Sequence, residues 1–310
     1  DSAIVSYKQA IKIKPDFAEA YNNIGLAAQD KGELEAAIGS FKQALKIKPD
    51  FAEAYSNMGN ALKDKGDREA AINSYKNAIK IKPDYAKAYN NMGIALKDKG
   101  ELVAAIDSFK QALKFKPDDA ETHNNLGTAL FDKGDLKAAI ESYKQAIQIK
   151  PDYAHAYNNM GIALQEKGNL EVAIDSYKQA LKIKPDFAEV YYNMGITLKD
   201  KGDLEAAIGS YKQALKIKPD YAEAYNNMGA SLEDKGDLKA AVDSFKQALE
   251  IKPDFAEAYN NMGSSLRNKG DLKAAIESFK QALKIKPDSS VAWNNLIFPL
   301  QAMKLQAPSI

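Results

Sequence analysis

The chain has 310 residues, with 43 basic and 42 acidic side chains and a formal net charge of +1. This balance excludes a global electrostatic field that would draw nucleic acid or anionic lipid to the protein. The absence of cysteine excludes disulfides and thiolate metal sites, and it leaves the compartment open, with the cytoplasm favoured. No run of about 18 apolar residues occurs, so we expect no membrane partner.

A Pro-Asp pair recurs every 34 residues, and the sequence between successive pairs repeats almost unchanged. A fixed period of this length predicts a solenoid of helix-turn-helix units, because each unit needs its neighbours to cover its apolar face. The predicted array is a single domain over 1–310, with a half repeat at 1–17, eight full repeats at 18–289 and a terminal helix at 290–310.

The second full repeat, 52–85, illustrates the predicted elements. Asp50 and Glu53 have the spacing of a capping box, which predicts a first helix that begins close to residue 51. Gly66 ends this helix, and Asp67 caps a second helix that runs to the next Pro-Asp pair. Each repeat is therefore predicted to be a helical hairpin.

Residues are numbered below by their position within a repeat, with Ala52 at position one of the second repeat. At about 100° per residue, positions three, four, seven, eight, ten and eleven of the first helix share one side, and we expect that side to pack. Positions two, five, six, nine, twelve and thirteen share the opposite side, which we expect to be accessible. Gly59, at position eight, allows two helix axes to approach closely.

The repeat resembles the tetratricopeptide repeat. The shared residues are an aromatic at position four, Leu or Met at seven, Gly at eight, Ala at twenty, Phe or Tyr at 24, Ala at 27 and Pro at 32. His123 departs at position four and Ile297 at position eight, and the nearby Pro299 predicts a short or kinked last helix. The resemblance implies an all-α, right-handed superhelical solenoid whose first helices line a concave groove.

Position six of the accessible side is Asn in every repeat, and these residues are named the asparagine ladder. A primary amide offers two donors and one acceptor, so it can pair with the backbone of an extended peptide irrespective of its sequence. The alternative is that each Asn bonds the adjacent hairpin and fixes the angle between repeats. The ladder comprises Asn23, Asn57, Asn91, Asn125, Asn159, Asn193, Asn227, Asn261 and Asn295.

A similar asparagine ladder is found in the repeat arm of O-linked N-acetylglucosamine transferases, which this chain resembles. It differs from family members that bind acidic chain termini through a carboxylate clamp, because position six is never Arg and position two is usually Glu. Only Asn60 and Lys87 match single elements of that clamp, so clamp-type binding is not expected.

Acidic side chains gather on the accessible side at positions two and thirteen, which predicts an acidic groove and a preference for basic partners. The alternative role for Glu at position two is to stabilise the helix N-terminus, and both roles are compatible. The residues are Glu19, Glu53, Glu121, Glu189, Glu223 and Glu257, with Asp30, Asp64, Asp98, Asp132, Glu166, Asp200 and Asp234.

Position nine varies most between otherwise similar repeats, and its aliphatic members suggest small specificity pockets for ligand side chains. The alternative is that isolated surface aliphatics carry no function. The candidate residues are Leu26, Asn60, Ile94, Thr128, Ile162 and Ile196.

Catalytic and metal sites have little support in the sequence. The only histidines, His123 and His155, have no ligand or nucleophile partner at motif spacing, so we expect surface or packing roles and no cofactor. The glycines mark helix ends and close packing, and they form no phosphate-binding loop. Lysines of the second helices are interleaved with Asp and Glu, so we expect no nucleic-acid partner.

The leading functional hypothesis is a non-catalytic scaffold that binds an extended peptide or a partner protein in its groove. Two alternatives are a substrate-recruiting arm of a larger glycosyltransferase-type enzyme and a self-stacking structural module.

The chain begins partway through a repeat without an initiator Met, so we expect it to be a piece of a longer protein. Its apolar ends predict head-to-tail self-association; they carry Ile4, Tyr7 and Ile11, and Trp293, Leu296, Phe298, Leu300 and Met303.

Overall fold

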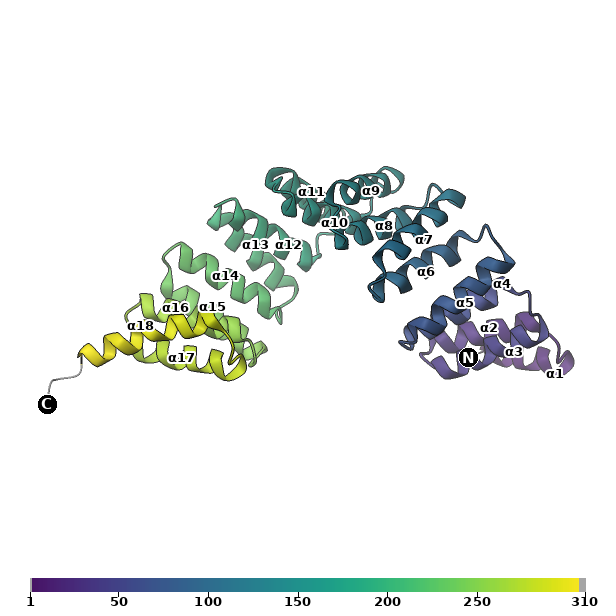
Figure 1. The fold of residues 1–310 in the computed structure, drawn as a ribbon, viewed down its shortest axis with the longest axis horizontal. Helices are drawn as coiled ribbons and strands as arrows, with labels where there is room; N and C mark the ends of the chain where they lie inside the picture. The colour runs from purple at the N-terminus through teal and green to yellow at the C-terminus, as the bar shows by residue number, and fades with distance from the viewer. Residues whose placement is uncertain (1, 307–310) are drawn as a thin grey trace. The chain divides into compact units, whose positions relative to one another are not determined.

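Successive helical hairpins form the chain in the computed structural model (Figure 1). The structure describes the backbone of residues 2–306 and the side chains of residues 5–7 and 9–302. The helices belong to two compact units, residues 1–156 and 157–310. Every regular element of the described residues is a helix, so the all-α solenoid predicted from the sequence is confirmed. The single domain over 1–310 remains a proposal.

The first unit contains nine complete helices, and α10 (Ala154–Glu166) begins at its end. These nine are α1 (Ser2–Ile13), α2 (Ala18–Asp30), α3 (Leu34–Ile47), α4 (Ala52–Asp64), α5 (Arg68–Ile81), α6 (Ala86–Asp98), α7 (Leu102–Phe115), α8 (Ala120–Asp132) and α9 (Leu136–Ile149).

The second unit continues the same order of elements. Its helices are α11 (Leu170–Ile183), α12 (Ala188–Asp200), α13 (Leu204–Ile217), α14 (Ala222–Asp234), α15 (Leu238–Ile251), α16 (Ala256–Asn268), α17 (Leu272–Ile285) and α18 (Ser290–Gln306). In both units the second helix of a repeat also packs against the first helix of the next repeat.

The turn inside each hairpin forms as the sequence predicts. Gly66 has φ of +92°, in the left-handed region that favours glycine after a helix. The carboxylate of Asp67 then accepts a hydrogen bond of 3.1 Å from the backbone N–H of Ala70, which caps α5. A glycine and a capping side chain therefore place the two helices of this repeat side by side.

The start of the first helix differs from the capping-box prediction. The N-cap residue of α4 is Phe51, and no side chain caps its backbone N–H groups. Asp50 lies one residue before the N-cap, so its carboxylate is out of register with the orphan donors, and the capping-box prediction is wrong. Glu53 still lies in the first turn, where its charge opposes the positive end of the helix dipole.

The core of each hairpin is an aromatic ring from the second helix placed on a glycine of the first. Tyr211 of α13 is fully buried, and a Cβ atom added at Gly195 of α12 would lie 2.6 Å from its ring. The same contact joins Gly59 to Tyr75 in the first unit. Position eight therefore needs glycine for close approach, as the sequence indicates.

The last helix is not short, because α18 continues through Pro299 to Gln306, within the range 290–310 predicted for the terminal helix; the kink at Pro299 stays a prediction. Of the apolar residues predicted to be exposed at the chain ends, Trp293 is 53% exposed and Phe298 60% exposed, whereas Leu296 is buried. The side chains of Ile4 and Met303 lie outside the described residues. Head-to-tail association stays a prediction.

Two glycine substitutions in one repeat test the ring-on-glycine contact. Gly195→Ala forces a methyl group against the buried ring of Tyr211 and is expected to lower the free energy of unfolding by about 1–3 kcal/mol. Gly209→Ala in α13 meets open space and is expected to stabilise by about 0.5–1 kcal/mol through helix propensity. Urea unfolding followed by circular dichroism measures both, and equal effects would contradict the packing described.

Candidate functional site

Seven of the nine ladder asparagines donate a side-chain hydrogen bond to the repeat before them. The side-chain Nδ2 at position six donates to the Oδ1 of the Asn at position five of the preceding repeat, over 3.0 or 3.1 Å. The pairs with this geometry are Asn57 with Asn22, Asn125 with Asn90, Asn193 with Asn158, Asn261 with Asn226 and Asn295 with Asn260. The ladder is therefore a chain of amide contacts between successive first helices within each unit.

Two ladder residues reach other acceptors where position five is not Asn. Asn91 donates to the Oδ1 of Asn60 at 2.9 Å, because Ser56 occupies position five of that repeat. Asn227 donates to the hydroxyl of Tyr192 at 3.1 Å. An acceptor from the preceding repeat is thus present even where the sequence changes, and the inter-repeat role that the sequence left open is part of the structure.

Position five corrects the helical-wheel assignment. The sequence placed it on the accessible side, yet Asn22, Asn90, Asn158 and Asn226 are all buried, at 2–8% exposure. A wheel describes one helix alone, whereas the first helix of the next repeat covers this side. Position six stays partly exposed in every repeat of the ladder.

The side-chain amide of Asn193 keeps hydrogen-bonding groups free after its bond to the preceding repeat has formed. An Asn side chain carries two N–H donors and a carbonyl acceptor, and the bond to the preceding repeat uses one donor. Within the described residues, the Oδ1 atom and the second N–H of Asn193 have no protein partner. Such an amide can pair with one peptide unit of a ligand.

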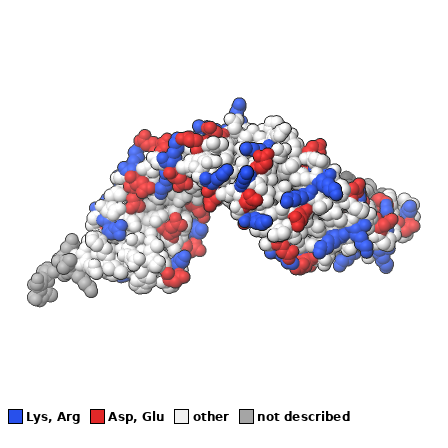
Figure 2. Space-filling model, turned by 45° about the horizontal axis from the view of Figure 1, so that its top comes forward, with Lys and Arg blue, Asp and Glu red and all other residues white. Residues whose placement is uncertain are grey.

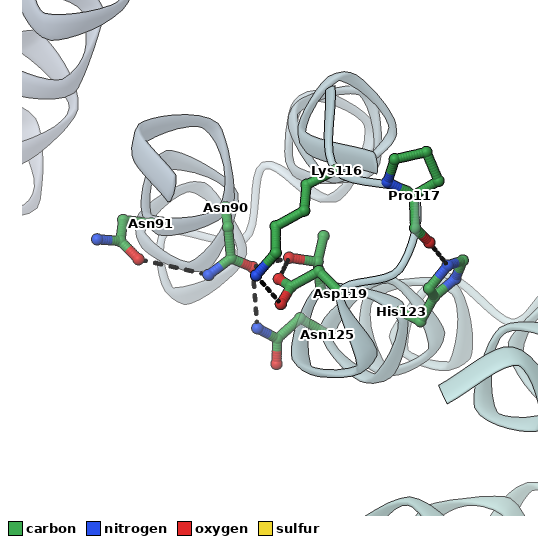
Figure 3. Close-up of polar contacts among 8 residues, drawn as sticks. Asn90, Asn91, Lys116, Pro117, Asp119, His123 and Asn125 are labelled. Atoms are coloured by element: carbon green, nitrogen blue, oxygen red, sulfur yellow. Dashed lines mark hydrogen bonds and ion pairs between the residues drawn. The ribbon is translucent and has the colours of Figure 1, made fainter. Parts of the chain in front are cut away.

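Figure 3 shows the ladder at the junction of α6 and α8. Asn90 accepts from Asn125 and from the Oγ1 of Thr122 at 3.2 Å, and it donates to Asn91 at 3.4 Å. Lys116 lies 3.1 Å from Asp119. Burial raises the pKa of Asp119, but the bonds from Thr122 and Lys116 outweigh it and hold this pKa below its ordinary value.

The two histidines occupy different surroundings. A ring nitrogen of His123, Nε2, lies 2.9 Å from the carbonyl oxygen of Pro117 and holds the turn before α8 (Figure 3). His155 is exposed, and its ring lies edge-on to that of Tyr153. In the part of the chain that the structure describes, no three His, Asp or Glu side chains gather as a metal site.

Many carboxylates of the accessible side are paired with lysine or amide groups. Lys48 lies 3.3 Å from Glu19, and Lys252 lies 3.2 Å from Glu223, in each case within one repeat. A backbone hydrogen bond and the Lys48 ammonium lower the pKa of Glu19 from its ordinary value. Glu53 lies 4.0 Å from Lys82, Glu257 accepts from Asn226 at 3.2 Å, and Glu121 and Glu189 are exposed.

The carboxylates at position thirteen contact Gln or Lys side chains at position twelve, mostly from the preceding repeat. Contacts of 2.8–3.9 Å join Gln29 to Asp64, Lys97 to Asp98 and Asp132, Gln165 to Asp200 and Lys199 to Asp234, while Asp30 is exposed. On the face shown in Figure 2, basic and acidic side chains are interleaved. Many carboxylates of the acidic surface expected from the sequence thus have a lysine or an amide partner, while Glu121, Glu189 and Asp30 are exposed.

Position nine divides into polar residues with internal partners and aliphatic residues. Asn60 accepts from the hydroxyl of Tyr75 at 2.8 Å, and Thr128 accepts from that of Tyr143 at 3.4 Å. Burial raises the pKa of Tyr143 to about 12, so its phenol stays neutral. Leu26 is 37% exposed, whereas Ile94, Ile162 and Ile196 are partly buried.

Sequence reasoning missed the lysine at position 31, which lies beside the accessible face. The Nζ atom of Lys184 lies 4.5 Å from the ring centroid of Phe187 at position 34, and Lys48 lies 4.7 Å from that of Phe51. A cation over an aromatic face is attractive. The recurring Lys-Pro-Asp-aromatic sequence was the available signal.

None of the described helices is both long and apolar enough to cross a bilayer.

Comparison with known structures gives similar folds. The chain is 18% identical to one in the APC/C hetero-tetramer Cut9–Hcn1, with a TM-score of 0.62, over 86% of this chain and about half (52%) of that one, which shows the fold alone. It is 25% identical to YrrB, described as a TPR protein with an unusual peptide-binding site, with a TM-score of 0.51, over 64% of this chain and 99% of YrrB. MamA is 30% identical, with a TM-score of 0.50, over 54% of this chain and 97% of MamA.

The search of curated proteins gave no match. Family models match nearly the whole chain. The model described as TPR repeat matches residues 1–32, 29–66, 59–100, 93–134, 127–168, 164–202 and 197–236, and the one described as tetratricopeptide repeat matches 222–255 and 256–289. Together with the hairpins and the ring-on-glycine core, these matches show that the chain belongs to the tetratricopeptide repeat family.

Proposed function

We propose that the chain is a non-catalytic protein-interaction scaffold whose asparagine ladder binds the backbone of an extended peptide or of an extended segment of a partner protein. The observation that carries this proposal is the partly exposed amide at position six, which recurs in every repeat and which, from Asn57 on, is in most repeats oriented by a hydrogen bond to the preceding repeat. The tetratricopeptide repeat family and the likeness to YrrB support it.

The spacing of the ladder suits an extended ligand. Neighbouring helices pack about 8–10 Å apart, and an extended chain advances about 3.3 Å per residue. One ladder amide per repeat therefore meets a ligand peptide unit about every third residue. Recognition of this kind depends on the ligand backbone, and ligand side chains that face position nine, at Leu26 or Ile162 for example, add selectivity.

The inter-repeat bond prepares the ladder for binding. A free Asn side chain loses rotamer freedom when it binds a ligand, whereas Asn193 is already held by Asn158 at 3.0 Å. Groups ordered before binding lose less entropy on binding, so more of the interaction free energy appears as affinity. The structural role and the binding role of the amide thus support each other.

Matched double variants of the second unit test the ladder. Asn193→Ala with Asn261→Ala removes two ladder amides, and Asn158→Ala with Asn226→Ala breaks the same two inter-repeat bonds but retains the ladder amides. A net hydrogen bond contributes about 0.5–1.5 kcal/mol, so the first variant is expected to lose about 2- to 10-fold in affinity for each amide. Fluorescence anisotropy with peptides selected from a random 12-residue library against the wild-type chain measures this loss.

The position-five variant is the control, because it breaks the same two inter-repeat bonds and also removes the bonds that Asn158 donates to Asn159 and Asn226 to Asn227 and Glu257, so any loss of stability shared by the two variants is separated from the loss of the ladder amides. Peptide affinity in Asn158→Ala with Asn226→Ala is expected to stay within about threefold of wild type, since the ladder amides remain. Equal loss of affinity in the two variants would show that the ladder acts on binding only through the fold.

The proposed preference for basic peptides is expected to be small, because many carboxylates of the accessible side are paired. On a peptide array, Lys-rich sequences are expected to bind more strongly than Glu-rich ones at low salt, and this difference should fall at high salt, where exposed charges are screened within about 3 Å at 1 M. Equal capture of acidic and basic peptides at low salt would rule out the electrostatic preference.

A further inference from the structure

Two repeats lack the aromatic ring that ends the others. Position 34 is Asp119 in the repeat 86–119 and Ser289 in the repeat 256–289. In the remaining full repeats it is Phe51, Tyr85, Tyr153, Phe187, Tyr221 and Phe255. The space that this ring occupies within its repeat is named the ring slot.

In a complete repeat the ring slot has an apolar floor and a cationic edge. Phe51 packs in a buried cluster with Ala18 at position one and Ala44 at position 27. The ammonium of Lys48 at position 31 lies 4.7 Å from the ring centroid. The other five rings have the equivalent lysine at 4.5–5.1 Å, so cation and ring form a constant pair.

A pocket is present at both ring slots that have no ring. The slot at Ser289 has a volume of about 260 Å³ and is lined by Ala256, Ala282 and Lys286, at positions one, 27 and 31, by Val291, and by the polar side chains of Glu257 and Asn260. The slot at Asp119 measures about 230 Å³. A cavity of about 150 Å³ suffices for benzene, so a phenyl ring fits either volume.

The exposure of the alanine at position one depends on whether the repeat carries the ring. Among ring-bearing repeats that lie within one unit, this alanine is 3–9% exposed, at Ala18, Ala52, Ala120, Ala188 and Ala222. Ala86 and Ala256, in the two repeats without a ring, are both partly exposed. The floor of the slot is thus uncovered only where the ring is absent.

The turns beside the two empty slots are held in another way. The indole Nε1 of Trp293 donates to the carbonyl oxygen of Pro287 at 3.0 Å, and His123 makes the equivalent contact with Pro117 at 2.9 Å. These two repeats are also the ones followed by a residue other than Tyr at position four. The turn therefore keeps its shape without a ring, and the slot remains open.

The two empty slots differ in chemistry. At Asp119 the lysine of the slot is engaged, since Lys116 pairs with the carboxylate at 3.1 Å. At Ser289 the walls include two alanines and a valine, and although Glu257 also lines the slot, Lys286 forms no ion pair and lies over no ring in the described part of the chain. The slot at Ser289 thus has the apolar floor and unpaired cation that suit an aromatic ring.

We propose that the ring slot at Ser289 binds a Phe or Tyr side chain of the ligand, which supplies from outside the ring that other repeats carry themselves. This inference rests on the proposed function, because the ligand that brings the ring is the peptide held by the ladder. The slot adjoins the ladder through Asn260, which lines the slot and accepts from Asn295 at 3.0 Å. An aromatic residue of the ligand is therefore anchored while its backbone meets the ladder amides.

The test uses N-acetyl-phenylalaninamide as a probe and methyl NMR of Ala256, Ala282 and Val291 as the readout. In the wild-type chain, ring currents are expected to produce saturable upfield shifts of these methyl groups. Ser289→Phe supplies the ring within the chain, as Phe255 does in the preceding repeat, and is expected to weaken probe binding at least tenfold. Ser289→Ala leaves the slot open and is expected to bind the probe as the wild type does.

The Lys286→Met variant tests the contribution of the ammonium group to binding separately from that of the apolar side chains in the slot. It is expected to reduce affinity for N-acetyl-phenylalaninamide about threefold or more, and to leave the weaker binding of N-acetyl-leucinamide unchanged. Unchanged affinity for the phenylalanine probe in both Ser289→Phe and Lys286→Met, or shifts confined to other methyl groups, would overturn the proposal. Because the probe lacks an extended backbone, failure here would leave the Asn193 and Asn261 test of the ladder intact.

Discussion

The contact between a buried ring and a glycine sets the geometry on which the other features depend. Tyr75 and Tyr211 are fully buried, and a Cβ atom at the glycines they cover would lie within 2.6 Å of a ring atom. Such a contact allows little rotation of the first helix about its axis. Because a helix turns about 100° per residue, it also fixes the directions of positions five and six. The side chain at position five is then buried in the contact between repeats, and the side chain at position six stays partly exposed.

The asparagine ladder follows from that geometry. A buried amide such as Asn158 needs a partner, because an unsatisfied polar group in the interior costs about 1–3 kcal/mol. Asn193 of the next repeat supplies the donor and keeps its remaining donor and acceptor for a ligand. The sequence left two roles open, repeat-to-repeat bonding and peptide binding. The geometry accommodates both in the same side chain, since the two roles use different atoms.

Local features were predictable from the sequence because they depend on neighbours along the chain. The turn at Gly66, the cap at Asp67 and the packing of Gly59 all follow from backbone conformation and helical period. Features set by contacts between helices were not predictable. The burial of Asn22 depends on the next hairpin, whereas the lysine partner of Glu19 and the open slot at Ser289 depend on how the two helices of one hairpin meet, and a single helical wheel omits both kinds of contact.

A ladder amide bonds the preceding repeat through one N–H and a ligand through its other atoms, and NMR of the Asn193 side chain tests this division most directly. The two Nδ2 protons of this amide have separate resonances. The account predicts that the proton bonded to Asn158 exchanges slowly with solvent and shifts little when a selected peptide is added. The other proton is predicted to exchange quickly in the free chain and to shift and become protected in the complex. Equal exchange of both protons in the free chain, or no change in either when peptide binds, would contradict the account.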